Sequence, residues 1–93
     1  MQVKNILLNF KENFSLVLEL SKQNGLYGFA FYTTYDLGGF GKLLLNVDHS
    51  YKSIYDLKVA VKKEARVLIR KYFKFNKKMI DEINTKLDQL EEL

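Results

Sequence analysis

His49 is the only histidine of the chain, and it is the first residue to consider for chemistry. A serine nucleophile could lie close by in sequence, at Ser50 or Ser53, but a triad needs the imidazole oriented by a third group. Neighbouring positions in one segment do not indicate that geometry. One histidine in a chain without cysteine also falls short of a zinc ligand set. We therefore predict that His49 is a polar residue at the end of a strand.

The other groups able to do chemistry are carboxylates and one Gly-Lys pair. Five of the eleven Asp and Glu residues gather towards the C-terminus, at Asp81, Glu82, Asp88, Glu91 and Glu92. Their spacing is typical of the solvated face of a helix and not of a buried acid–base pair. Gly39–Lys42 lacks the spacing and the hydroxyl residue of a phosphate-binding loop. We predict no enzymatic activity, no metal and no cofactor.

Length and composition indicate one small domain over residues 1–93. The absence of cysteine favours a reducing compartment and excludes a disulfide framework. No segment has the order of a signal peptide, and no apolar run approaches the roughly 20 residues of a membrane span. We expect a cytoplasmic protein of a bacterial cell, without a membrane partner.

The clearest electrostatic pattern is a ladder of cations every four residues. Its members are Lys58, Lys62, Arg66, Arg70 and Lys74, with Lys63 beside them. Four residues advance an α-helix by about 40° past a full turn, so the ladder curls slowly round a helix. Such a stripe could follow the phosphates of RNA or DNA. The alternative is a solvated face that pairs in part with the acidic C-terminal helix.

An aromatic segment, Leu26–Tyr35, is the second candidate for binding. It is dense in aromatic and β-branched residues and predicts a strand. Its centre, Gly28-Phe29-Ala30-Phe31, resembles the RNP1 motif of RRM proteins. The resemblance implies that Phe29 and Phe31 would stack on bases, with Tyr35 farther along the same face. The alternative is that these aromatic rings belong to the hydrophobic core.

The remaining elements complete an α+β fold. Apolar spacing predicts a short amphipathic helix over residues 2–12, and residues 14–20 fit either a strand or the continuation of that helix. Asn24-Gly25 favours a hairpin, and residues 42–48 read as a strand. Ser53 is a candidate N-cap for a basic helix over residues 54–74. We expect the order α-β-β-β-α-α or α-β-β-α-α, with a small antiparallel sheet of two or three strands, one N-terminal helix and two C-terminal helices.

The last helix carries an apolar repeat that could pair two copies of the chain. Its members are Ile80, Ile83, Leu87 and Leu90. Heptad-like spacing is typical of a coiled-coil seam or of a packed helix pair. If this seam forms a homodimer, Asp at Ile83 or Leu87 would give a folded monomer.

The overall profile is similar to that of the small phage-encoded inhibitors of bacterial defence nucleases, the anti-CRISPR proteins. The chain is short, free of cysteine and proline, rich in Lys, Asn and Ile, and lacks catalytic groups. This resemblance implies a non-catalytic inhibitor of a nucleic-acid-handling defence machine, with a CRISPR nuclease or similar nucleoprotein as partner. One alternative is a module that binds RNA or DNA directly through the basic helix. The other is a homodimeric interaction protein that pairs through the C-terminal helix.

Overall fold

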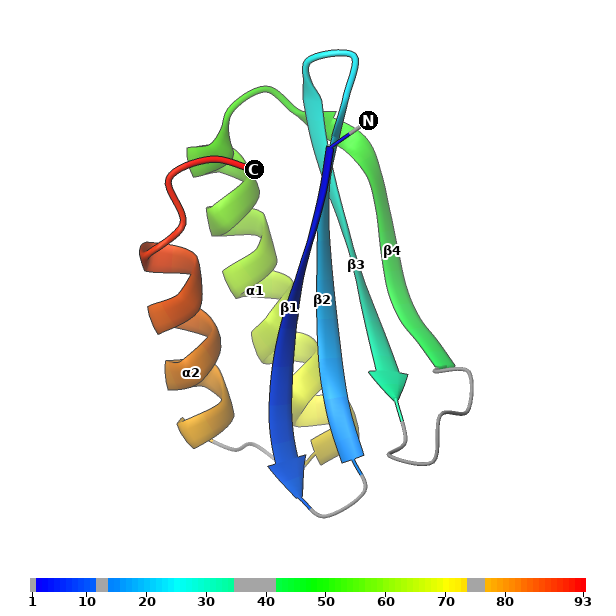
Figure 1. The fold of residues 1–93 in the computed structure, drawn as a ribbon. Coiled ribbons are helices and arrows are strands. Elements are labelled where there is room, and N and C mark those ends of the chain that lie inside the picture. The colour runs from blue at the N-terminus through cyan, green and yellow to red at the C-terminus, as the bar shows by residue number, and fades with distance from the viewer. Residues whose placement is uncertain (1, 12–13, 35–41, 74–76) are drawn as a thin grey trace.

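The architecture is a four-stranded sheet followed by two helices (Figure 1). The computed structural model describes residues 2–11, 14–34, 42–73 and 77–93. The elements are β1 (Gln2–Lys11), β2 (Phe14–Gln23), β3 (Leu26–Thr34), β4 (Lys42–Tyr51), α1 (Ile54–Phe73) and α2 (Lys77–Asp88). The strands pair in the order β1-β2-β3-β4, and each pair is antiparallel. The strands therefore form a simple meander.

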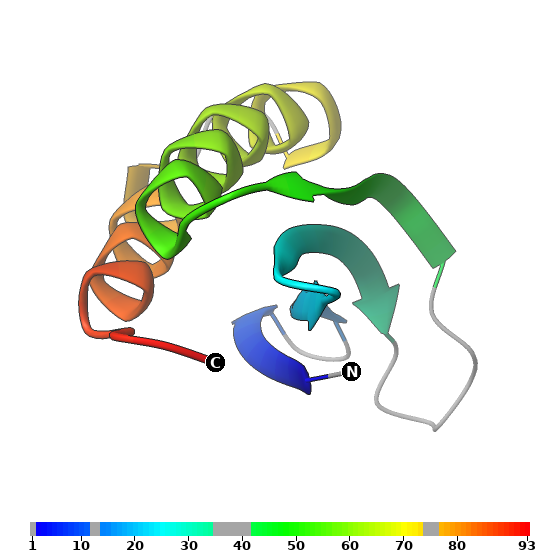
Figure 2. The same ribbon diagram turned by 90° about the horizontal axis from the view of Figure 1, so that it is seen from above.

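The molecule has two layers, with both helices on one face of the sheet (Figure 2). α2 packs against β1, whereas α1 packs against β3 and β4. Neither of the two described helices covers the other face of the sheet (Figure 2). These layers confirm the predicted α+β class. Among the described residues, no helix is both long and apolar enough to cross a membrane.

The predicted N-terminal helix over residues 2–12 is wrong, because most of this segment forms β1. Ile6 and Leu8 are buried under α2, whereas Val3 and Leu7 are about half exposed on the opposite face. That alternation has the period of a strand. β1 pairs with β2 along its length, with Ile6 opposite Leu18, and so adds a strand to the sheet. The sheet consequently has four strands and not two or three.

The ambiguity over residues 14–20 is resolved in favour of a strand. β2 lies between β1 and β3 and exposes neither edge. The loop after it contains only Asn24 and Gly25, with φ of 54° and 80°. Two successive left-handed residues are the signature of a type I′ hairpin, whose twist matches that of the flanking strands. The hairpin predicted from Asn24-Gly25 is confirmed.

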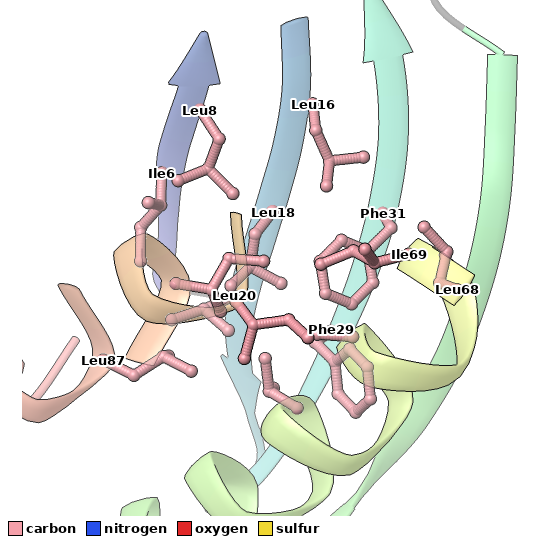
Figure 3. Packing of buried hydrophobic residues seen from close by; sticks show 14 of the residues in the cluster. Ile6, Leu8, Leu16, Leu18, Leu20, Phe29, Phe31, Leu68, Ile69 and Leu87 are labelled. Carbon is pink, nitrogen blue, oxygen red and sulfur yellow. The ribbon is translucent and has the colours of Figure 1, made fainter. Parts of the chain in front are cut away.

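The core lies between the helices and the inner face of the sheet (Figure 3). Leu16, Leu18 and Leu20 are fully buried at alternate positions of β2. The rings of Phe29 and Phe31 meet edge to face at 6.0 Å. Full burial of one Leu or Phe side chain contributes about 1.5–3 kcal/mol to the free energy of folding. Leu57, Val61, Leu68 and Ile69 of α1 cover this surface, together with Met79, Ile80, Ile83 and Leu87 of α2.

The start of α1 follows the prediction. The backbone N–H of Asp56 donates to Ser53 Oγ at 3.1 Å, so Ser53 is the N-cap. Asp56 also places a negative charge in the first turn, where the helix dipole favours it. The cap and the dipole together define where the basic helix begins.

Candidate binding surface on helix α1

Helix α1 carries the charge imbalance of the whole protein. It contains six Lys and Arg residues and two Asp and Glu residues. The whole chain contains 15 Lys and Arg residues and 11 Asp and Glu residues, so its net charge of +4 equals the net charge of α1. The rest of the chain is therefore balanced. A charge excess gathered on one helix creates a local positive potential that attracts anionic partners.

The predicted cation ladder divides into two parts. Near α2, the ammonium Nζ of Lys62 lies 2.6 Å from Oδ1 of Asp88. This ion pair is partly exposed and contributes less than about 1 kcal/mol. Lys58 is partly buried in the same half of the helix. Lys74 lies outside the described residues.

The C-terminal half of the ladder faces solvent. Lys63, Arg66, Arg70 and Lys71 are exposed around Val67, whose side chain is 57% exposed. Two shallow hollows of about 420 Å³ each share Arg66 and Val67. Of the described residues that line these two hollows, none is acidic. We call these five residues the α1 cationic face.

Exposed apolar residues extend the same side of α1 towards its N-terminus. Tyr55 is 72% exposed and Val59 is 51% exposed. Both line a hollow of about 650 Å³ at the corner between β4 and α1, where Tyr51 also lies. Protein interfaces are enriched in aromatic residues and Arg, and their centres are more apolar than their rims. The mixed surface of α1 has this character.

The expectation that Phe29 and Phe31 could stack on nucleic-acid bases is wrong. Both rings face the helices and are 2% and 0% exposed. On the other face of β3, Gly28 lies so close to β4 that an added Cβ would be 2.9 Å from the Val47 carbonyl oxygen. The resemblance to RNP1 therefore reflects a core strand. Tyr35 lies outside the described residues.

The proposed dimer seam is likewise part of the core. Ile80, Ile83, Leu87 and Leu90 are all buried within a single chain. Ile83 and Leu87 are only 1% and 0% exposed. The heptad-like repeat arises because α2, together with Leu90 just after its end, lays one apolar stripe on the core.

His49 has a partner that its sequence neighbours did not suggest. Its Nε2 lies 2.6 Å from Ser21 Oγ, and the two share a hydrogen bond across the outer face of the sheet. The ring reaches β2 because Gly28, on the intervening strand, has no side chain. Ser50 instead donates to Asp48 O, and Ser53 caps α1. In the part of the chain that the structure describes, no cluster of three His, Cys, Asp or Glu could hold a metal.

The Ser21–His49 hydrogen bond is expected to stabilise the sheet. Ser21 is 7% exposed, so removal of its partner leaves a buried hydroxyl unsatisfied. We predict that His49→Ala and Ser21→Ala are coupled by about 1 kcal/mol. Urea unfolding of both single variants and the double variant measures this coupling. Additive losses in the double variant would show that the contact contributes nothing.

Fold and surface together define a class: a two-layer α+β protein of order β-β-β-β-α-α with a cationic helix on its exterior. Protein-family models, curated proteins and solved structures gave no significant match to this chain.

Proposed function

We propose that this protein is a non-catalytic inhibitor of a bacterial nucleic-acid-handling defence machine of the CRISPR type. Its contact surface is the α1 cationic face, and its target is an acidic, partly apolar surface of the machine. The observation that carries the proposal is the gathering of the net charge on one exposed helix. Charge segregated in this way steers association and suppresses wrong partners.

The composition of the face supports a protein target over bare nucleic acid. Val67 lies among the cations, and Tyr55 and Val59 add further exposed apolar surface to the same helix. An apolar centre with a charged rim is the usual anatomy of a protein interface. Burial of Phe29 and Phe31 also removes the stacking platform that single-stranded nucleic acid would use.

Charge reversal on α1 tests the proposal. We expect Lys63→Glu combined with Arg66→Glu to weaken binding to the target nuclease at least about tenfold, because attraction becomes repulsion. The matched control is Lys77→Glu with Lys78→Glu, two exposed lysines at the start of α2. It changes the total charge equally and should leave affinity within about twofold. Biosensor titration against purified guide-loaded and guide-free CRISPR nucleases measures both variants.

Two results would contradict this assignment. Equal losses in the two charge-reversed variants would mean that total charge matters and the α1 face does not. If the α1 variant still inhibits DNA cleavage as strongly as the wild type, the α1 cationic face is not the surface that contacts the nuclease. Circular dichroism on every variant separates these outcomes from unfolding.

Direct binding of RNA or DNA is the second candidate, and it is favoured because none of the described residues around the two hollows that share Arg66 and Val67 is acidic. Fluorescence anisotropy with single-stranded RNA, double-stranded RNA and double-stranded DNA at two salt concentrations tests it. Dissociation constants below about 10⁻⁶ M that rise steeply with salt would support this candidate, because typical non-specific binding is weaker. If no nucleic acid binds, the hypothesis of a protein target remains.

A further inference from the structure

The free edge of β1 presents backbone groups that another strand could bind. β1 is the first strand of the sheet, and among the described strands it pairs only with β2. The carbonyl oxygen of Leu7 accepts a hydrogen bond from Lys86 Nζ of α2 at 2.8 Å, so it points away from β2. Alternate residues of an antiparallel strand direct both backbone groups to the same side. Val3 and Asn5 therefore also direct their N–H and C=O groups outward.

A groove runs along this edge, between β1 and α2. Lys4, Asn5 and Leu7 line it from the strand, and Lys86, Gln89 and Leu90 line it from the helix side. Its volume is about 490 Å³. A groove between an edge strand and a helix can receive an extended peptide by strand addition, with backbone hydrogen bonds for affinity and side-chain pockets for specificity.

The residues around the edge indicate the side chains of the added strand. Inside the groove, Lys4 and Lys86 supply two cations. The nearby carboxylate of Glu82 lies 3.5 Å from Lys86 and offsets part of this charge. Leu7 borders the groove at the strand edge, but its side chain and that of Val3 lie on the face of β1 opposite Ile6 and Leu8, where they are 50% and 48% exposed. Because side chains of a strand alternate between faces, acidic residues would meet the groove and apolar residues would meet Val3 and Leu7.

We propose that the β1 edge and α2 form a second binding site, for an extended peptide of alternating acidic and apolar residues in a partner protein. In the free protein, Lys86 Nζ donates its hydrogen bond to the Leu7 carbonyl oxygen. When the peptide binds, Lys86 pairs with a carboxylate of the peptide instead. A second copy of this chain is disfavoured, because its β1 would bring another Lys4 and Lys86 into the same groove. This site is separate from the α1 cationic face and does not depend on the function assigned to it.

A seven-residue peptide of alternating glutamate and valine is the direct probe. Titration into ¹⁵N-labelled protein is expected to shift the amide signals of residues 3–7 and 86–90, with saturation in the micromolar to millimolar range. The same peptide with alternate amides N-methylated should bind at least about tenfold more weakly, because it cannot complete the ladder. A peptide of alternating lysine and valine should not bind. Equal binding of all three peptides, or shifts confined to α1, would overturn the proposal.

Two variants of β1 complete the test. Asn5→Pro removes an outward N–H and leaves the β1–β2 ladder intact, since proline is tolerated on edge strands. We expect it to reduce peptide affinity at least about tenfold, and Lys4→Glu to do the same through charge. Both sites are exposed, and thermal melting verifies the fold. Analytical sedimentation of the protein without peptide tests for self-association. If the wild type is a dimer and Asn5→Pro is a monomer, the β1 edge pairs two copies of the chain, and the peptide proposal is overturned.

Discussion

Replacing Leu87 with aspartate is expected to unfold the protein at 25 °C. Leu87 is fully buried, and it packs in the core with Ile83 and with the strands (Figure 3). Truncating a buried leucine costs about 2–5 kcal/mol, and an uncompensated carboxylate adds several more. A domain of this size is stable by about 5–15 kcal/mol, so the variant loses most or all of its stability.

The matched control for Leu87→Asp is Thr85→Asp, an exposed position in the same helix. It introduces the same side chain and should change stability by less than about 0.5 kcal/mol. Far-ultraviolet circular dichroism and gel filtration measure both variants. A folded, monomeric Leu87→Asp protein that derives from a wild-type dimer would contradict the core assignment and restore the seam between two copies.

Gly28→Ala is expected to produce the second large effect. A methyl group at Gly28 would lie 2.9 Å from the Val47 carbonyl oxygen and 3.0 Å from the His49 nitrogen. Both are backbone atoms, so β4 must shift and the irregularity in its register with β3 must change. Overpacking of this kind costs about 1–3 kcal/mol, and we expect the upper end. The melting temperature should fall by roughly 10 °C or more.

The control for Gly28→Ala is Gly25→Asn in the hairpin loop. No atom lies within 4 Å of the added Cβ at Gly25, and only its φ of 80° disfavours a side chain. Asparagine tolerates this left-handed conformation better than most residues. We expect a loss below about 1 kcal/mol, measured by the same thermal melting. Equal stability of Gly28→Ala and the wild type would contradict the close approach of β3 and β4.

The wrong N-terminal helix and the undecided face of the aromatic strand have the same origin. Val3, Ile6, Leu7 and Phe10 have helical spacing, but Leu7 belongs to the outer face of a strand. Half-exposed Val3 and Leu7 on the outer face and buried Ile6 on the inner face therefore had the spacing of one helical stripe. The aromatic strand had a similar ambiguity, because either alternate face could have been buried. Pairing with β2 and packing under the helices settled both cases, and neither contact is visible in the local pattern.

The candidate site was predictable where it depends on one helix. The basic residues of α1 and its start at Ser53 follow from spacing and capping alone. Partial pairing of the ladder with the acidic C-terminal helix was one of the alternatives, but the choice of Lys62 as the paired cation depends on Asp88 of another element, 26 residues away. The Ser21–His49 contact spans 28 residues, and the Lys86–Leu7 contact spans 79. No motif in the chain signals the Ser21–His49 contact or the Lys86–Leu7 contact.

Local physical chemistry was sufficient for the hairpin at Asn24-Gly25, the capped basic helix and the lack of disulfides. Each depends on backbone preference or residue type within a few positions. Long-range packing decided which aromatic face is buried, whether Ile83 and Leu87 are seam or core, and which cations remain at the surface. These outcomes depend on burial against distant elements, since free energy comes from the apolar area that the whole sheet and both helices remove from water.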